Sequence, residues 1–214
     1  MNKKILAVVC LVSALSLSLL CSSSQAQSLG PAAIKTTYGY LFVYNGKDKS
    51  YTMEIRGKTI TTETAGENPA FVVDGNSLQM LAVVNENFLQ GLLETDEDKM
   101  LALHQKWESE YLMNEMYHRT FNVDSESLSV GGRKMRFWGF KRPGFNDNFD
   151  RDYQLTTIVG SKLVGLSSAL RPNEIVADGK KLMVDVLSTI KISDKPFDVM
   201  KLAEQIGVDA RPNK

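Results

Sequence analysis

The sequence predicts an α+β domain, with a mostly antiparallel sheet of about six strands flanked by helices as an α/β/α sandwich. Short runs of β-favouring residues alternate with turn sequences such as Asp74-Gly75-Asn76 and Gly160-Ser161, which is typical of hairpins. Residues 95–118 and 172–190 instead carry apolar residues three and four positions apart, which is typical of amphipathic helices. Hydrophobic residues make up 43% of the chain and charged residues 23%, as in ordinary globular proteins.

The first 26 residues have the pattern of a secretory signal peptide. Lys3 and Lys4 precede an uncharged apolar run from Ile5 to Leu20, and small residues follow in Ser24-Gln25-Ala26. We therefore predict export to the periplasm or the exterior, with cleavage before Gln27. The alternative is that the apolar run stays as an N-terminal anchor helix, although it is short for a membrane span of about 20 residues.

Cys21 offers a second alternative, because a cysteine after an apolar run can be lipidated. Leu20 precedes it, however, where a lipoprotein signal normally has a small residue. Membrane contact is expected only if Cys21 is lipidated. Cys10 and Cys21 are the only cysteines, so the cleaved chain has no disulfide, no thiolate nucleophile and no cysteine-bound zinc.

The N-terminal half of the mature chain is expected to be rich in strands. Residues 27–36 form an irregular lead-in, because Gly30 and Pro31 interrupt any pattern. Strands are expected at 38–44, 51–56, 58–64, 71–73 and 78–84. Acidic residues after Thr95 then start the first long helix, which runs to about His118.

The C-terminal half repeats this order of strands followed by helix. Strands are expected at 128–130, 134–140, 153–159 and 162–166, followed by the helical region 172–190. A last helix spans about 196–206 and stops at Gly207. We divide the chain into a signal peptide (1–26), the lead-in (27–36), an α+β domain (37–193) and a C-terminal helix with its tail (194–214).

Charge and motifs narrow the function classes. The 25 basic and 25 acidic residues balance, which argues against a dedicated nucleic-acid binder. The sequence has no G-x-S-x-G elbow, P-loop, G-x-G-x-x-G or H-E-x-x-H motif, and nothing in it predicts a cofactor. We therefore expect a protein without enzymatic activity.

Two histidines are candidates for metal binding. His104 has Glu108 one turn later, and His118 has Glu115 three residues earlier. Fourteen helical residues separate the histidines by roughly 21 Å, too far for one ion, so each pair would need further ligands. The alternative is that both histidines pack at the border of the core.

An acidic loop follows Pro143-Gly144. Oxygen-bearing residues alternate there, as in a calcium loop: Asn146, Asn148, Asp150 and Asp152. Thr157, however, occupies the position of the glutamate that closes such a loop. A solvated connection between strands is the alternative. Asp147, Asp150 and Asp152 are also the candidates for carboxylate catalysis, which needs a defined separation and a cleft.

The predicted strand around residue 138 combines cations with aromatic residues. Strand alternation puts Met135 and Phe137 on one face. The other face then carries Lys134, Arg136, Trp138, Phe140 and Arg142. Exposed, this face could bind an anionic ligand or a partner. In the alternative, neighbouring acids shield the cations and the tryptophan packs inward.

The order of elements, with Phe137-Trp138-Gly139-Phe140, the hairpin 156–168 and the phrase 187–192 (LSTIKI), resembles the PsbP/DcrB-like superfamily of small exported domains. The resemblance covers about residues 38–192. It implies an α/β/α sandwich and an accessory or binding role, with no shared catalytic residues.

We therefore expect an exported, non-enzymatic binding or accessory protein of the cell envelope. Its partner would be a protein or an anionic envelope component. The alternatives are a carboxylate-dependent envelope hydrolase and a metal-binding periplasmic protein.

Overall fold

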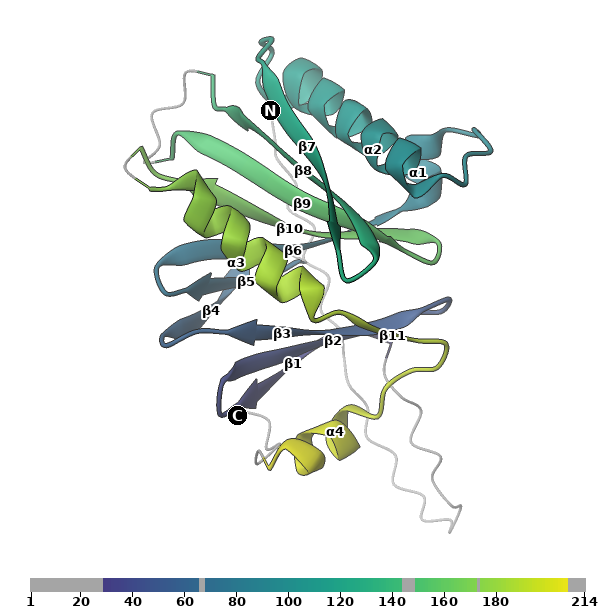
Figure 1. Ribbon diagram of the computed structural model, residues 1–214, viewed down its shortest axis with the longest axis vertical. Helices are drawn as coiled ribbons and strands as arrows, with labels where there is room; N and C mark the ends of the chain where they lie inside the picture. Colours follow the sequence, from purple (N-terminus) through teal and green to yellow (C-terminus); the bar gives the residue numbers. More distant parts are fainter. Residues whose placement is uncertain (1–28, 66–67, 144–148, 173, 208–214) are drawn as a thin grey trace, which may run out of the picture.

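The computed structural model describes residues 29–65, 68–143, 149–172 and 174–207, which form an α+β fold (Figure 1). These residues build two antiparallel sheets, of four strands in the order β1-β2-β3-β11 and of seven in the order β4-β5-β6-β10-β9-β8-β7. The α+β class and the antiparallel pairing are confirmed, whereas a single sheet of about six strands is wrong. The predicted signal peptide lies outside the described residues.

The four-stranded sheet contains a strand where the sequence predicted an irregular lead-in. Its members are β1 (Gly30–Thr36), β2 (Gly39–Asn45), β3 (Ser50–Arg56) and β11 (Lys191–Ser193). β1 pairs with β2 along its whole length and buries Ile34. Pro31 is tolerated because β1 is an edge strand, where a missing N–H leaves no ladder bond unmade.

The seven-stranded sheet is assembled from hairpins. Its strands are β4 (Ile60–Ala65), β5 (Asn68–Val73), β6 (Asn76–Val84), β7 (Val123–Val130), β8 (Arg133–Lys141), β9 (Arg151–Val159) and β10 (Lys162–Leu170). The turn between β9 and β10 needs glycine, since Gly160 has a φ of 59°. The pairing of β6 with β10 joins the two halves of the chain at the centre of the sheet.

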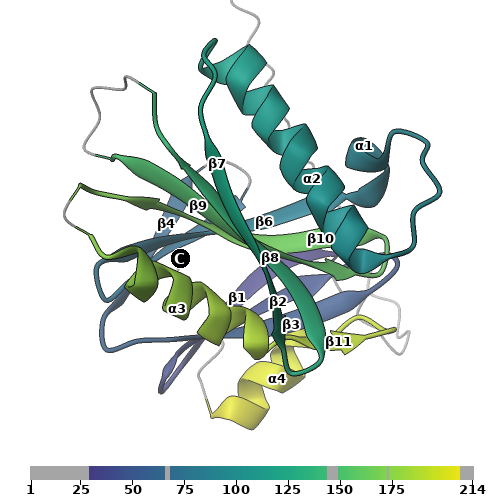
Figure 2. The same cartoon turned by 45° about the horizontal axis from the view of Figure 1, so that its top comes forward.

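Two helices, α1 and α2, cover one face of the larger sheet (Figure 2). α2 (Glu97–Tyr111) begins after Asp96, whose side chain accepts hydrogen bonds from the backbone N–H groups of Asp98 and Lys99. It continues as a π-helical turn, η1 (Leu112–Met116), and is preceded by the short α1 (Asn85–Leu89), which the sequence did not predict. Phe88 and Leu101 pack there on Leu163 of β10.

The main core lies on the opposite face of the larger sheet. α3 (Val176–Ser188) contributes Met183 and Leu187, which pack with Leu155 of β9 and with Met53 of β3. The two sheets and α3 therefore share one hydrophobic core.

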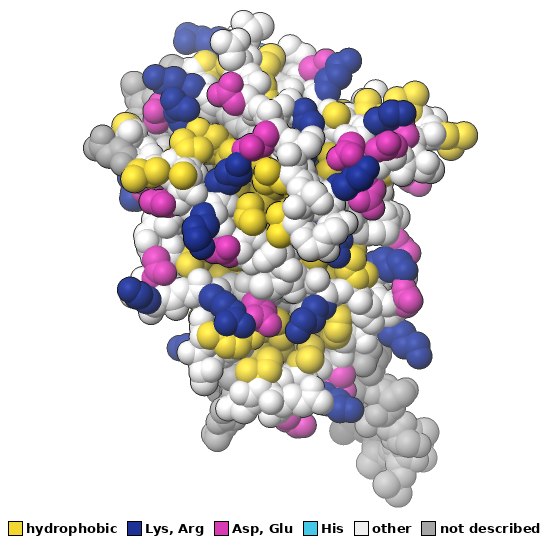
Figure 3. All heavy atoms as spheres, viewed as in Figure 1, with side chains coloured by type: hydrophobic (Ala, Val, Ile, Leu, Met, Phe, Trp, Pro, Cys, Tyr) yellow, Lys and Arg dark blue, Asp and Glu magenta, His cyan; other side chains and the backbone are white. Residues whose placement is uncertain are grey.

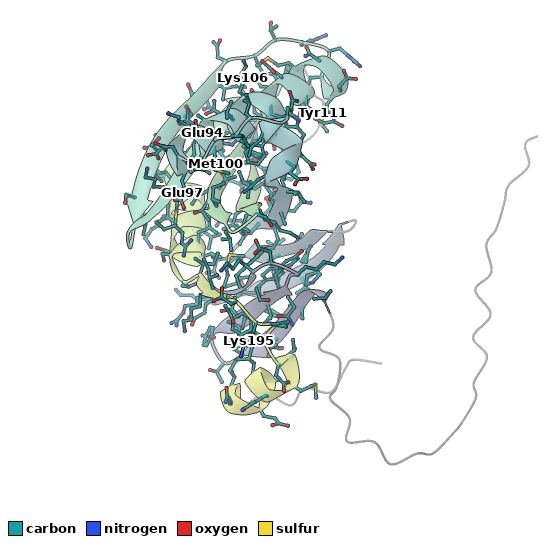
Figure 4. The ribbon with its side chains drawn as sticks, turned by 90° about the vertical axis from the view of Figure 1, so that its right-hand side faces the viewer. Glu94, Glu97, Met100, Lys106, Tyr111 and Lys195 are labelled. Carbon is teal, nitrogen blue, oxygen red and sulfur yellow. The ribbon has the colours of Figure 1, made fainter. Side chains whose placement is uncertain are left out.

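The outer face of the smaller sheet is covered by α4 (Val199–Ile206). Ala203 packs there on Leu41 and Val43 of β2. Figure 4 places Lys195 near this end of the molecule, opposite the labelled residues of α2. None of the helices in the described ranges is long and apolar enough to cross a membrane.

Candidate functional site

The aromatic residues of the predicted cationic strand are buried. Trp138 is 0% and Phe140 4% exposed, beneath Leu112 of η1 and beside Phe121. The ring of Phe121 stacks on that of Phe140, with centroids 4.2 Å apart. The alternation predicted for β8 is correct. Of the two alternatives for this face, the exposed one is wrong for Trp138 and Phe140, and the one in which the tryptophan packs inward is confirmed, because α2 and η1 cover this face of the sheet.

The cations of the same strand are held by neighbouring polar groups. Nζ of Lys134 lies 2.6 Å from the carboxylate of Asp98, whose hydrogen bond raises the pKa of this lysine. Arg136 donates to the side chain of Gln105 on α2 and to Oγ of Ser125 on β7. These contacts fasten α2 and β7 to β8.

Arg142 has the same kind of role at the end of β8. It donates to both carboxylate oxygens of Asp152, at 2.7 and 2.8 Å. The five residues predicted as a binding surface therefore do not form one open face. They act in packing and in contacts between elements.

His104 is a core residue of α2. Its ring is 1% exposed and meets the ring of Phe88 edge-on, with centroids 5.4 Å apart. Burial lowers its pKa from 6.5 to about 4, so the imidazole is neutral at pH 7. Its Nδ1 has no hydrogen-bond partner among the described residues.

Glu108 lies one turn further along α2. Burial raises the pKa of its carboxyl, while a hydrogen bond with Gln154 of β9 acts in the opposite direction. Glu115 and His118 are exposed near η1, away from the buried His104. In the described ranges, no three His, Asp or Glu side chains come close enough to hold a metal ion.

The predicted acidic group falls partly outside the described residues, which include neither Asp147 nor Asn146 and Asn148. Asp150 and Asp152 are described, and both contact cations. Asp150 lies 3.8 Å from Nζ of Lys141 and 3.7 Å from Nε of Arg151, and Asp152 is bound by Arg142. Both carboxylates therefore take part in contacts between neighbouring strands and loops, and in the described part of the chain they do not face each other across a cleft of their own.

Sequence reasoning missed a pocket between the two sheets, which we call the inter-sheet pocket. It has a volume of about 210 Å³ and is lined by Pro31, Phe42, Tyr44, Tyr51, Pro69, Met80, Leu81, Ala82 and Lys162. These residues come from β1, β2, β3, β5, β6 and β10. No local pattern could have revealed this pocket, because it exists only where the two sheets meet.

The inter-sheet pocket combines an aromatic wall with a cation. The rings of Tyr44 and Tyr51 stack with centroids 5.1 Å apart. Nζ of Lys162 lies 4.6 Å from the ring centroid of Tyr44 and within hydrogen-bonding reach of its hydroxyl. The carboxylate of Asp48, which accepts a hydrogen bond from the backbone N–H of Ser161, attracts Lys162, but within the described part of the chain no carboxylate lies within ion-pair distance of this lysine.

A second apolar surface lies at the connection between α1 and α2. Figure 3 shows hydrophobic side chains at the right-hand tip of the molecule, beside these helices. Leu92 is 57% exposed and Leu93 is fully exposed. A shallow groove of about 170 Å³ beside them is lined by Leu89, Leu103 and Trp107, among others. This surface has apolar area but lacks the stacked aromatic wall of the inter-sheet pocket.

Comparisons with known proteins show similarity at the level of structure. No protein-family model matches the chain, and no curated protein matches it. The chain is similar to the solution structure of cyanobacterial PsbP (CyanoP) from Synechocystis sp. PCC 6803. The TM-score is 0.43 and the sequence identity 12%, over 81% of this chain and 99% of that chain.

Proposed function

We propose that the protein is an exported, non-enzymatic binding or accessory protein of the cell envelope, and that the inter-sheet pocket is its ligand site. The observation that carries this proposal is the stacked Tyr44–Tyr51 wall with the ammonium group of Lys162 beside it. Binding pockets commonly join apolar walls with a few placed polar groups in this way.

The lining indicates the chemistry of the ligand. An aromatic ring or short alkyl group would pack on the half-buried ring of Tyr44, behind which Phe42 is buried. A carboxylate on the same ligand would pair with Lys162. At about 210 Å³ the pocket is below the usual size of drug-sized sites, so it suits one small group, either a free molecule or part of a partner.

The buried titratable groups support a role without catalysis. His104 of α2 packs against the ring of Phe88, and the carboxyl of Glu108 forms a hydrogen bond with Gln154 of β9. Neither residue lines the inter-sheet pocket. The titratable groups that do line it are the two tyrosines and Lys162, and burial raises the pKa of Tyr51 above its usual value, which keeps its hydroxyl protonated.

Titration of the ¹⁵N-labelled mature chain with 3-phenylpropionate tests the pocket. We expect shifts at the amides of Tyr44, Ala82 and Lys162, and weaker shifts with the uncharged 3-phenylpropanol. Lys162→Met should weaken binding of the acid about tenfold, as expected from losing one charge contact of about 1.4 kcal/mol.

The matched control is Lys180→Met. Lys180 also lies over an aromatic ring, with Nζ 5.3 Å from the centroid of Phe137, but neither residue lines the inter-sheet pocket. Affinity for the acid should not change in this variant. No shifts at millimolar acid, or equal affinity of Lys162→Met and the parent protein, would show that the pocket is not the ligand site.

A further inference from the structure

Strand β6 has an open edge beside the inter-sheet pocket. On one side, β10 pairs with β6 from Gln79 to Val84. On the other side, β5 pairs with β6 only as far as Ala70 and Gln79. Within the described ranges, the segment Met80–Val84 therefore has a neighbouring strand on one side only.

The register shows which backbone groups face the open side. The backbone N–H of Asn85 donates to the carbonyl oxygen of Ser161 at 2.9 Å, so Asn85 faces β10. Backbone groups alternate in direction along a strand, so Val83 and Leu81 also face β10, while Ala82 and Met80 face the open side.

Pro69 makes this edge more open. One step beyond the last pair, Ala70 with Gln79, the register places Pro69 opposite Met80. Pro69 has no N–H to donate to the carbonyl of Met80. The carbonyl of Met80 and both backbone groups of Ala82 therefore lack a strand partner in the described part of the chain. Met80, Ala82 and Pro69 all line the inter-sheet pocket, so the free groups and the pocket are contiguous.

This edge also lacks the usual protection against pairing. Exposed edges normally carry charges or prolines that discourage another strand. The open edge of β7 carries Asp124 and Glu126, and that of β1 carries Pro31 and Lys35. The segment Met80–Val84 has neither a charge nor a proline, and the small side chain of Ala82 is exposed.

We infer that an extended segment of a partner protein adds as a strand to β6 at Ala82, with one apolar side chain in the inter-sheet pocket and an acidic side chain near Lys162. The inference rests on the proposed function and names the ligand as part of a protein. In strand addition, backbone hydrogen bonds supply affinity and an adjoining pocket supplies specificity. The acidic preference follows from charge complementarity with Lys162.

A random dodecapeptide library displayed on phage is a suitable probe for the mature chain. We expect selection of peptides with an apolar residue and a nearby Asp or Glu. Ala82→Pro, which removes the open N–H, should weaken peptide binding at least tenfold. Ser129→Pro is the matched control, because the turn after Val130 directs the N–H of Ser129 to the open edge of β7.

Amide hydrogen exchange tests the same point without a substitution. The amide of Ala82 should exchange quickly in the free protein, unlike those of Leu81 and Val83, and at least tenfold more slowly with a selected peptide. Slow exchange at Ala82 in the free protein would overturn the inference, as would a library without binders or binders indifferent to Ala82→Pro. If 3-phenylpropionate still bound in those cases, strand addition alone would be wrong; if it did not bind, the pocket proposal would fail as well.

Discussion

For single residues of β8, the local sequence pattern predicts the face of the strand but not the burial of the side chain. Alternation along β8 correctly separated Met135 and Phe137 from Arg136 and Trp138. It could not show that both faces are covered, because the residues over Trp138 come from η1 and from Phe121, more than 15 positions earlier in the chain. Burial depends on such long-range contacts, which is why Trp138 was assigned to a surface.

His104 makes stability depend on pH. Its pKa is about 4 in the folded protein and near 6.5 when exposed, because burial disfavours the charged ring. Between these values the unfolded chain binds a proton that the folded protein does not, so stability falls as pH decreases from about 6.5 to 4. We expect a loss of about 2 kcal/mol at pH 5 relative to pH 7.5 from this group.

Urea unfolding of the parent protein and of His104→Gln, each at pH 5 and pH 7.5, measures this effect. Other titrating groups such as Glu108 are present in both proteins, so the difference between their pH dependences isolates His104. His118→Gln is the matched control, because it removes a histidine that is exposed and lies outside the core. Equal pH dependence of His104→Gln and the parent would contradict a buried neutral histidine.

At the scale of elements, the sequence predicts hairpins well and connections poorly. The strands around Gly160-Ser161 were predicted because turn and alternation are local signals. β1 was missed because Gly30 and Pro31 read as a break, although pairing with β2 overrides that preference. α1 has only five residues, too few for a helical period to be visible.

One buried side chain joins β2 to the segment before α4. Nδ2 of Asn45 donates to the carbonyl oxygen of Phe197 at 2.9 Å, and Oδ1 accepts from the N–H of Phe197 at 2.8 Å. Asn45 is 2% exposed, so its loss would leave two backbone groups of Phe197 poorly satisfied. We expect Asn45→Ala to destabilise the docked α4 by about 1–3 kcal/mol.

Amide exchange across Val199–Ile206 measures this local destabilisation. Exchange there should become roughly 5- to 150-fold faster in Asn45→Ala, while β9 and β10 change much less. Asn76→Ala serves as the control, since the amide of Asn76 bonds within its own turn to the carbonyl of Val73. Unchanged exchange in α4 would show that the apolar contacts of Ala203 hold the helix without Asn45.

At the scale of the whole molecule, the number of sheets was the main error. Each hairpin was predictable, but no local pattern in the sequence specifies which hairpins pair with one another. β10 pairs with β6 across some 80 residues, and β11 pairs with β3 across about 140. The division into two sheets creates the inter-sheet pocket. The candidate site could therefore not be predicted either, because it too depends on strand pairs that are far apart in the sequence.

The N-terminal segment predicts export of the whole chain. Lys3, Lys4, the apolar run and Ser24-Gln25-Ala26 predict cleavage before Gln27. This would leave Gly30, the first residue of β1, three positions inside the mature chain, so the four-stranded sheet would be intact after processing. N-terminal sequencing of the exported protein should begin at Gln27, and its mass should match an unmodified chain.

A blocked terminus with the added mass of acyl groups at Cys21 would contradict cleavage at Ala26. The domain would then be tethered within about 30 Å of the membrane, the reach of the nine residues from Cys21 to Gly30.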